Sequence, residues 1–226
     1  MFIEPVAVFR SPFETKFGVP RQAGVVPELK GRIVFEPKFR NPDAVRGLEG
    51  FDYIWLVWGF SAVPEDGDHF QATVRPPRLG GDTRIGVFAS RSPFRPNRLG
   101  LSSVRIESIE YDCPDGPVIN VLGADLMDGT PVYDVKPYVT YTDSHPEAAA
   151  GFVDENGWKP LEVVFEASVP DGIDAEALRG ILAQDPRPRS QNDPERIYGM
   201  TFAGSDVRFK VSGGVLTVVS FARLCP

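Results

Sequence analysis

Residues 51–60 read FDYIWLVWGF, and Tyr53 to Phe60 within them is the longest apolar run in the chain. Aromatic and branched aliphatic side chains favour strands, and a run without regular polar positions is typical of a strand that is buried on both faces. We therefore predict a central strand here, on which the rest of the fold is organised.

Short strands are predicted on either side of this run. Separated by turn signals, they point to a β-barrel or a β-sandwich of six to eight strands. A single helical turn is expected over 43–48, after Asn41-Pro42. The expected strands, besides 51–60, are 2–9, 31–39, 85–89, 104–111, 118–122 and 135–141.

The pattern changes from about Glu147. A strand is predicted over 161–168, and a hairpin joins 207–211 to 215–221 through Ser212-Gly213-Gly214. Between them, Asp171 or Asp174 is expected to cap a helix. The apolar face of this helix would consist of Ala177, Leu178, Ile181 and Leu182. The predicted fold is mainly β: an N-terminal β-barrel with few helices over 1–148 and a small α+β domain over 149–226.

The composition is that of a soluble globular protein of 226 residues, with 42% hydrophobic and 24% charged residues. A net charge of −7 argues against a protein that coats nucleic acid over its whole surface. The two cysteines provide neither a disulfide framework nor metal-ligand spacing, and His69 and His145 are far apart in the sequence. We expect no metal, no signal peptide, no membrane span and a cytoplasmic location.

Positive charge is concentrated in one segment. Residues 75–97 read RPPRLGGDTRIGVFASRSPFRPN, and between 75 and 98 Asp82 is the only acid among six arginines. Four prolines, at 76, 77, 93 and 96, exclude most of this segment from helices and central strands. The segment is therefore interpreted as a stiff cationic loop that binds an anion, or as a surface loop whose arginines are solvated.

Several motifs resemble one known family. RPPRLGG, GVFASRSPFRPN, LGLS and DLMDGTPVYDVKPY (125–138) occur in that family's order. The similarity extends to SPFETKFGVPRQAG (11–24), LEGFDYIWLVWGF (48–60), DPRPRSQ and RIYGM (185–200). Together they resemble the TrmO (TsaA-like) family, which are S-adenosylmethionine-dependent methyltransferases that act on threonylcarbamoyl-adenosine beside the anticodon of tRNA.

The cofactor is implied by this resemblance alone. No glycine-rich turn opens a helix, so the usual dinucleotide-binding signature is missing. The family holds S-adenosylmethionine on a β-barrel beside a subunit interface, which implies a homodimer. The cofactor-binding residues implied by the resemblance are Pro20, Arg21, Gln22, Phe60, Ser61, Arg91, Leu101, Asp125, Leu126, Met127 and Asp128.

Two further groups are candidates for work on the substrate. Asp134, Lys136 and Tyr138 alternate along a predicted strand and would share one face, where they are candidate catalytic residues or simply an ion pair on the barrel rim. Contacts to the tRNA anticodon loop are expected from a second group, whose C-terminal members are alternatively interpreted as domain packing. This group is Arg78, Arg95, Asn97, Arg187, Arg196 and Tyr198.

The chain departs from the family pattern at three places. Ser61 stands where the family often has histidine, Arg98-Leu99 where it has proline and isoleucine, and Tyr133 where it has leucine. Asp125 and Asp128 also fit a plain turn in ADLMDGTP. The leading hypothesis is a cytosolic, homodimeric tRNA methyltransferase. The alternatives are a non-catalytic β-barrel RNA- or nucleotide-binding module and a methyltransferase for a small molecule.

Overall fold

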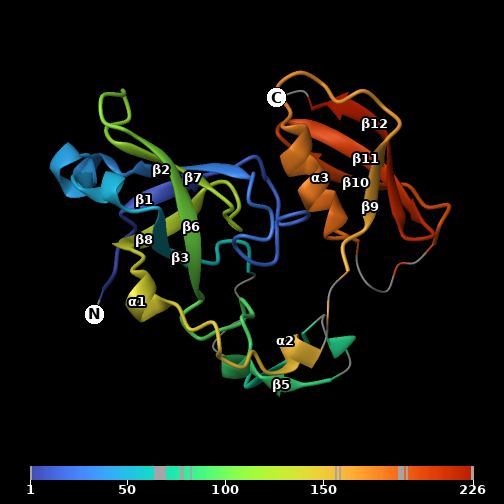
Figure 1. Ribbon diagram of the computed structural model, residues 1–226, viewed down its shortest axis with the longest axis horizontal. Coiled ribbons are helices and arrows are strands. Elements are labelled where there is room, and N and C mark those ends of the chain that lie inside the picture. Colours follow the sequence, from blue (N-terminus) through green and yellow to red (C-terminus); the bar gives the residue numbers. More distant parts are fainter. Residues whose placement is uncertain are drawn as a thin grey trace.

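The computed structural model describes residues 2–63, 70–76, 79–81, 83–155, 157, 159–187, 191 and 193–224. Figure 1 shows two β-rich lobes, a barrel and a C-terminal sheet with one helix on it. The barrel closes because the first strand pairs with both the second and the eighth, in the order β1-β2-β7-β6-β3-β8. Its strands are β1 (Ala7–Arg10), β2 (Lys30–Phe35), β3 (Tyr53–Gly59), β6 (Leu99–Glu110), β7 (Val118–Leu122) and β8 (Thr130–Pro137).

The mainly β fold with an N-terminal barrel is thus confirmed, but the prediction that the central strand is buried on both faces is wrong. On β3, Ile54 and Leu56 are fully buried inside the barrel, whereas Tyr53 is exposed and Trp55 and Val57 are half-buried. An antiparallel barrel has a single interior, so alternate residues of each strand must face outward. The apolar residues at outward positions of β3, Trp55 and Val57, line the cavity that is described below.

Proline and glycine shorten several predicted strands. The strand predicted over 31–39 ends at Phe35, and Pro37 opens a 3₁₀ turn, Pro37–Phe39. Further 3₁₀ turns are Pro42–Val45, where the single helical turn was expected, and Leu48–Gly50. In the arginine-rich segment, β5 (Ile85–Gly86) pairs with β4 (Thr73–Val74) outside the barrel, and Val87–Ala89 is again 3₁₀.

The C-terminal lobe contains the predicted helix and hairpin. Helix α3 (Ala175–Ala183) is capped by Asp174, whose carboxylate accepts from the backbone N–H groups of residues 176 and 177. All four residues of its predicted apolar face are buried. The sheet has the order β10-β11-β12-β9. Its strands are β9 (Glu162–Phe165), β10 (Tyr198–Phe202), β11 (Ser205–Ser212) and β12 (Val215–Arg223).

Two features of this sheet were not predicted: strand β10 and the parallel pairing of β9 with β12. The hairpin between β11 and β12 turns through Gly213 and Gly214, both at positive φ (59° and 83°), which a two-residue turn of this kind requires. Two short helices, α1 (Thr140–Asp143) and α2 (Phe152–Glu155), lie in the connection between the lobes. None of the helices in the described ranges is long and apolar enough to cross a bilayer.

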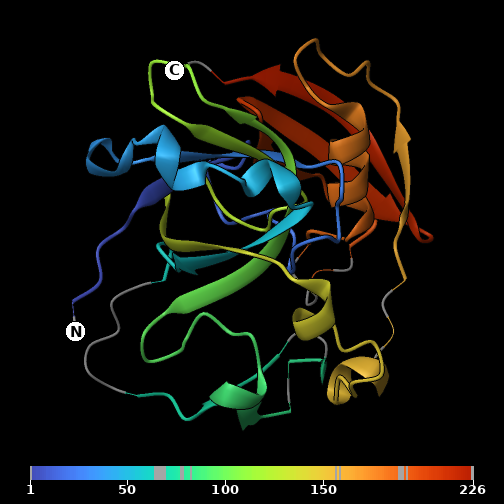
Figure 2. The same cartoon turned by 60° about the vertical axis from the view of Figure 1, so that its left-hand side comes forward.

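The two lobes share a hydrophobic core. Phe13, Val26 and Leu29, from the loop between β1 and β2, are buried among side chains of α3 and the C-terminal sheet. Figure 2 shows this loop running from the barrel to helix α3. The Phe13 and Phe202 rings meet edge-on with centroids 5.5 Å apart. The backbone N–H of Ala203 donates to Pro12 O at 2.9 Å. The β1–β2 loop is therefore fixed against the second lobe.

Candidate functional site: a cavity at one end of the barrel

A cavity of about 900 Å³ lies where the β1–β2 loop, the 90–95 loop and one end of the barrel meet. Antiparallel pairing brings the ends of β1, β3 and β7 and the starts of β2, β6 and β8 to this same end. Two loops thereby come to face the strand ends. One follows β1 and includes Pro20–Ala23, and the other, 125–130, precedes β8. Clefts of this size hold small-molecule ligands and cofactors.

The cavity is lined from both faces of strands β3 and β6. Trp58 and Ser102 belong to the inner face of the barrel and form what we call the inner wall, together with Asp125 and Thr130. The cross-strand pairs Trp55–Ser103 and Val57–Leu101 belong to the outer face and form the outer wall. A single cavity thus joins a polar inner part to a mostly apolar outer part.

A hydrogen-bonded chain fixes the inner wall. The indole Nε1–H of Trp58 donates to Ser102 Oγ at 3.0 Å, and that hydroxyl donates to Asp125 Oδ1 at 2.6 Å. Gly100 makes room for the indole, because a Cβ at this position would lie 2.3 Å from the Trp58 ring. Burial raises the pKa of the Asp125 carboxyl, while the Ser102 hydrogen bond and the positive charge of Arg91 act in the opposite direction.

The rim of the cavity is cationic although the protein is acidic overall. Lys16, Arg21, Arg91 and Arg95 all line it. Arg91 is exposed and donates from NH1 to Gln22 Oε1. Arg95 instead braces the 90–95 loop, because it donates to the carbonyls of Ser90 (2.6 Å) and Val87 (3.3 Å). The arginine-rich loop thus brings positive charge to a cavity, which is a requirement of the interpretation that it binds an anion.

The structure brings most of the predicted cofactor-binding residues together at this cavity. Two of the predicted residues, Leu126 and Asp128, do not line the cavity. Leu126 is buried in the barrel core, and Asp128 accepts hydrogen bonds from Ser11 N (3.1 Å) and Arg10 NH1 (3.3 Å). Those that line the cavity are Pro20, Arg21, Gln22, Phe60, Ser61, Arg91, Leu101, Asp125 and Met127.

The three candidate catalytic residues lie beside the cavity, Asp134 and Lys136 on β8 and Tyr138 directly after its last residue. Asp134 and Lys136 form an exposed ion pair at 3.2 Å. In the register they are the neighbours of Val57 and Trp55, so they continue the outer wall by one strand. The Tyr138 ring packs on Trp55, with centroids 5.5 Å apart.

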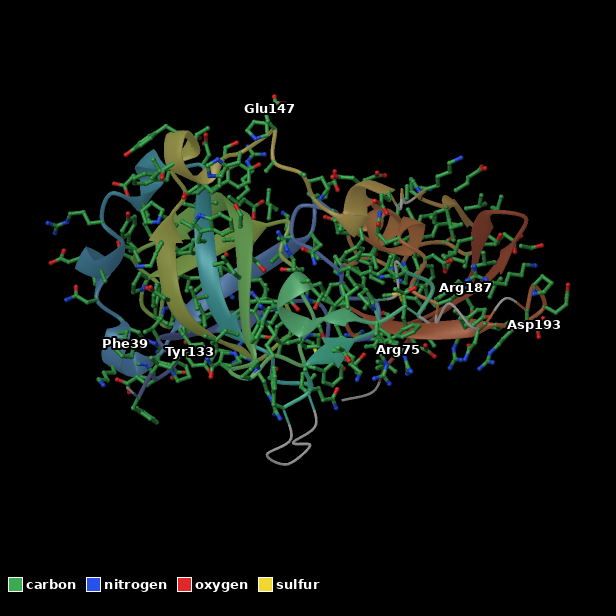
Figure 3. All side chains as sticks on the ribbon, turned by 90° about the horizontal axis from the view of Figure 1, so that it is seen from below. Phe39, Arg75, Tyr133, Glu147, Arg187 and Asp193 are labelled. Carbon is green, nitrogen blue, oxygen red and sulfur yellow. The ribbon has the colours of Figure 1, made fainter. Side chains whose placement is uncertain are left out.

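The predicted substrate-binding residues do not form one group. Arg95 lines the cavity and Asn97 is exposed on the following loop, while Arg78 lies outside the described residues. Figure 3 shows Arg187 in the C-terminal lobe, on the opposite side of the molecule from Tyr133 of the barrel.

The C-terminal members of this set make contacts within their own lobe. Arg187 is held by Asp185 through two hydrogen bonds, of 2.8 and 2.9 Å, which raise the pKa of its guanidinium. Tyr198 is buried, and the guanidinium carbons of Arg187 and Arg196 lie 5.8 and 5.4 Å from its ring centroid. Packing accounts for these contacts without a ligand.

Several residues of the cavity were not predicted from the sequence, among them Lys16, Trp55, Trp58 and Ser102. The two tryptophans were assigned to a core strand. Strict period-two alternation along an antiparallel strand would have placed Trp55 and Trp58 on opposite faces. No group of three or more His, Cys, Asp or Glu side chains in the described part of the chain is arranged to hold a metal ion.

Comparisons with known proteins agree with this architecture. Residues 8–144 match the family model of the tRNA-methyltransferase O N-terminal domain, and residues 161–224 match that of the TrmO C-terminal domain. A tRNA (adenine(37)-N6)-methyltransferase of Escherichia coli is 39% identical over 221 residues, which cover 92% of each chain. A protein of the same name from Eikenella corrodens is 42% identical over 176 residues, or 74% of this chain and 95% of the relative.

A solved structure is similar along the whole chain. The crystal structure of TrmO from Pseudomonas aeruginosa superimposes with a TM-score of 0.79 at 30% sequence identity, covering 98% of both chains. A Pseudomonas aeruginosa protein named as a putative S-adenosylmethionine-dependent methyltransferase is 37% identical over 220 residues, covering 92% of this chain and 91% of the relative. Both lobes are matched, in sequence and in structure, and the chain belongs to the tRNA-methyltransferase O (TrmO) family.

Proposed function

We propose that this protein transfers the methyl group of S-adenosylmethionine to the exocyclic N6 of the adenosine beside the anticodon in tRNA. The proposal is supported by membership of the TrmO family and by the names of relatives that match nearly the whole chain. The observation that carries it is the barrel-end cavity, in which a half-buried carboxylate faces an arginine-bearing rim. We further propose that the acceptor is threonylcarbamoyl-adenosine and that the protein works as a cytoplasmic homodimer.

The residues of the cavity fit the cofactor in three respects. Arg91 and Arg21 on the rim suit its carboxylate, since guanidinium groups bind carboxylates through charge-assisted hydrogen bonds. The Asp125 carboxylate suits its α-ammonium group or its ribose hydroxyls. Phe60, Leu101 and Met127 provide apolar surface for the adenine.

The reaction asks the protein mainly for alignment. The cofactor supplies an electrophilic methyl group on its sulfonium, and in-line transfer needs the acceptor nitrogen in contact with that methyl group. The N6–H proton is lost as the new C–N bond forms. Asp134, Lys136 and Tyr138 stay candidates for positioning the acceptor or receiving this proton, because they border the outer wall.

The surface around the 70–98 segment suits RNA. Phe70 and Phe88 are 59% and 68% exposed and their rings stack with centroids 6.1 Å apart. The guanidinium carbon of Arg95 lies 5.7 Å from the Phe88 ring centroid. Arg75, which directly follows β4, and Asn97, at the end of the segment, are both exposed. Exposed aromatic faces with arginines nearby bind single-stranded RNA through stacking and phosphate contacts.

Mass spectrometry of tRNA tests the proposed function. Unmodified and threonylcarbamoylated tRNA are each incubated with the protein and S-adenosylmethionine, hydrolysed to nucleosides and analysed. We expect a gain of one methyl group on the adenosine derivative next to the anticodon, and only in the threonylcarbamoylated tRNA. If the protein does not bind the cofactor and transfers no methyl group to tRNA, it is instead a non-catalytic binding module.

Replacing Arg91 with alanine should weaken cofactor binding about tenfold, the loss expected for a hydrogen bond to a charged group. The melting temperature should stay nearly unchanged, because Arg91 is exposed and its hydrogen bond is to the side chain of Gln22. Isothermal titration with S-adenosylmethionine measures the affinity. Arg84→Ala is the matched control, since Arg84 is an exposed arginine of the same segment that does not line the cavity. A large loss of stability in Arg91→Ala would assign Arg91 to a structural role.

A further inference from the structure

The outer wall of the cavity has a feature that cofactor binding does not explain. Trp55 is half-buried on the outer face of β3, with Ser103 of β6 beside it on one side and Lys136 of β8 on the other. Because Trp55 points away from the barrel interior, packing of the barrel core does not explain a tryptophan at this position. Its indole lines the same cavity as Asp125 and Arg91.

The orientation of this indole is fixed by contacts outside the cavity. Its Nε1–H donates to Asp143 Oδ2 at 3.0 Å, and the same oxygen accepts the backbone N–H of Val139 at 2.8 Å. Asp143 is the last residue of the short helix α1, which Figure 1 shows next to the start of β3 and the end of β8. The Tyr138 ring packs against the indole at 5.5 Å and a 44° interplanar angle. Helix α1 and the residues that join it to β8 therefore hold this one side chain in place.

A tryptophan held in this way offers a ligand its ring face. The one polar atom of the indole is already paired with Asp143, so the exposed part of the ring can contribute stacking and dispersion but no hydrogen bond. Stacking on aromatic side chains is the main way in which proteins bind unpaired nucleobases. Lys136, the neighbour of Trp55 on β8 and the partner of Asp134 in an exposed ion pair, adds a cation beside this ring.

The chemistry requires the acceptor base to enter this cavity. Methyl transfer needs the donor and acceptor atoms in direct contact, roughly 3–3.5 Å apart. Asp125 and Ser102 place the groups suited to the cofactor's polar parts on the inner wall. Beyond Leu101, the Trp55 and Val57 side chains of the outer wall leave an apolar surface for a planar partner in contact with that site.

We propose that Trp55 is the platform on which the acceptor adenine of the tRNA stacks, positioned by Asp143 and Tyr138. This inference rests on the proposed function and adds the residue that positions the nucleobase. It makes Trp55 a determinant of tRNA binding and leaves cofactor binding to the inner wall, the rim and Leu101.

Two substitutions of Trp55 test the platform. Trp55→Leu keeps apolar volume against Tyr138 but removes the aromatic face, and Trp55→Phe keeps an aromatic face. Tyr141→Ala is the matched control, because Tyr141 is an aromatic residue of α1 that is 91% exposed and makes no part of the cavity wall. Each variant is assayed for the KM of tRNA, for cofactor affinity and for oligomeric state by light scattering. Binding is also followed with an anticodon stem-loop RNA that carries 2-aminopurine in place of the acceptor adenine.

The wild-type protein should quench the 2-aminopurine fluorescence, since stacking on an aromatic ring quenches it. Trp55→Leu should abolish this quenching and raise the KM of tRNA about tenfold, given the usual contribution of one base–aromatic stack. Its cofactor affinity should stay within about twofold, and Trp55→Phe and Tyr141→Ala should retain both quenching and KM.

Three results would overturn the inference while leaving the proposed function intact. The first is methylation of tRNA by the wild-type protein together with full quenching and an unchanged KM in Trp55→Leu. Loss of cofactor affinity with unchanged quenching would place the cofactor's adenine on Trp55. A change of oligomeric state alone would make the outer wall an interface between copies of the chain. If the wild-type protein methylates no tRNA, the proposed function itself fails.

Discussion

Asp125→Asn is expected to weaken S-adenosylmethionine binding about 100-fold, near the upper end for a hydrogen bond to a charged group. The asparagine side chain has nearly the same shape and its Oδ1 can still accept the hydrogen bond from Ser102. The loss would therefore report the negative charge and not a rearranged wall. Isothermal titration at pH 7 measures it, with Asp115→Asn as a control, because Asp115 is an exposed aspartate paired with Arg40 away from the cavity.

The same substitution is expected to stabilise the unliganded protein at neutral pH. Burial raises the pKa of Asp125 in the folded state, so ionising this carboxyl costs more in the folded protein than in the unfolded chain. Removing the charge relieves this cost. The gain in melting temperature should shrink as the pH falls and vanish below the ordinary aspartate pKa of about 3.9, where the carboxyl is protonated in both states. An unchanged cofactor affinity, or a loss of stability at pH 7, would contradict the role assigned to Asp125.

Phe13→Ala is expected to lower the free energy of unfolding by about 3–5 kcal/mol, the usual cost of deleting a fully buried phenylalanine. Phe13 is 0% exposed and fills the core that the β1–β2 loop shares with the C-terminal lobe. Urea denaturation measures the loss. Phe88→Ala is the control, since its ring is 68% exposed and its removal should change the stability by less than about 0.5 kcal/mol.

The shared core also predicts how the lobes unfold. Because Phe13, Val26 and Leu29 belong to the barrel's own loop but pack inside the second lobe, the two lobes should unfold in one transition. Two separate transitions in the wild-type protein, or a loss of less than about 1 kcal/mol in Phe13→Ala, would show that this core does not couple the lobes.

Local signals in the sequence predicted local structure well. Helix α3 was predicted with its cap and its buried face, because Asp174 and the four apolar residues act within a few residues of one another. Barrel closure depends on pairing between β1 and β8, more than 120 residues apart. Neither strand's own sequence determines its partner, so the spacing of the strands was compatible with a sandwich as well as with a barrel. Strand β10 was missed for a similar reason, since Gly199 and Met200 are weak strand formers and its partner β11 defines it.

The same distinction applies to the site. Family motifs identified nine of the cavity's residues, but Asp125 looked like a turn residue by itself. Its contacts with Ser102 and Arg91 come from segments that only the fold brings together. Trp55 and Ser102 lie within the motifs 48–60 and LGLS but were given no role, because an outward tryptophan and a buried serine in a strand resemble ordinary sheet residues. The C-terminal arginines suggested RNA contacts by type, whereas the structure pairs Arg187 with Asp185.

A crystal structure of the protein with S-adenosylhomocysteine, the product form of the cofactor, tests the central claim most directly. The account predicts that the ligand lies in the cavity at the end of the barrel, with its polar groups near Asp125 and its carboxylate toward Arg91 and Arg21. Binding anywhere else, such as the small groove between Phe17 and Arg208 on the C-terminal lobe, would contradict it.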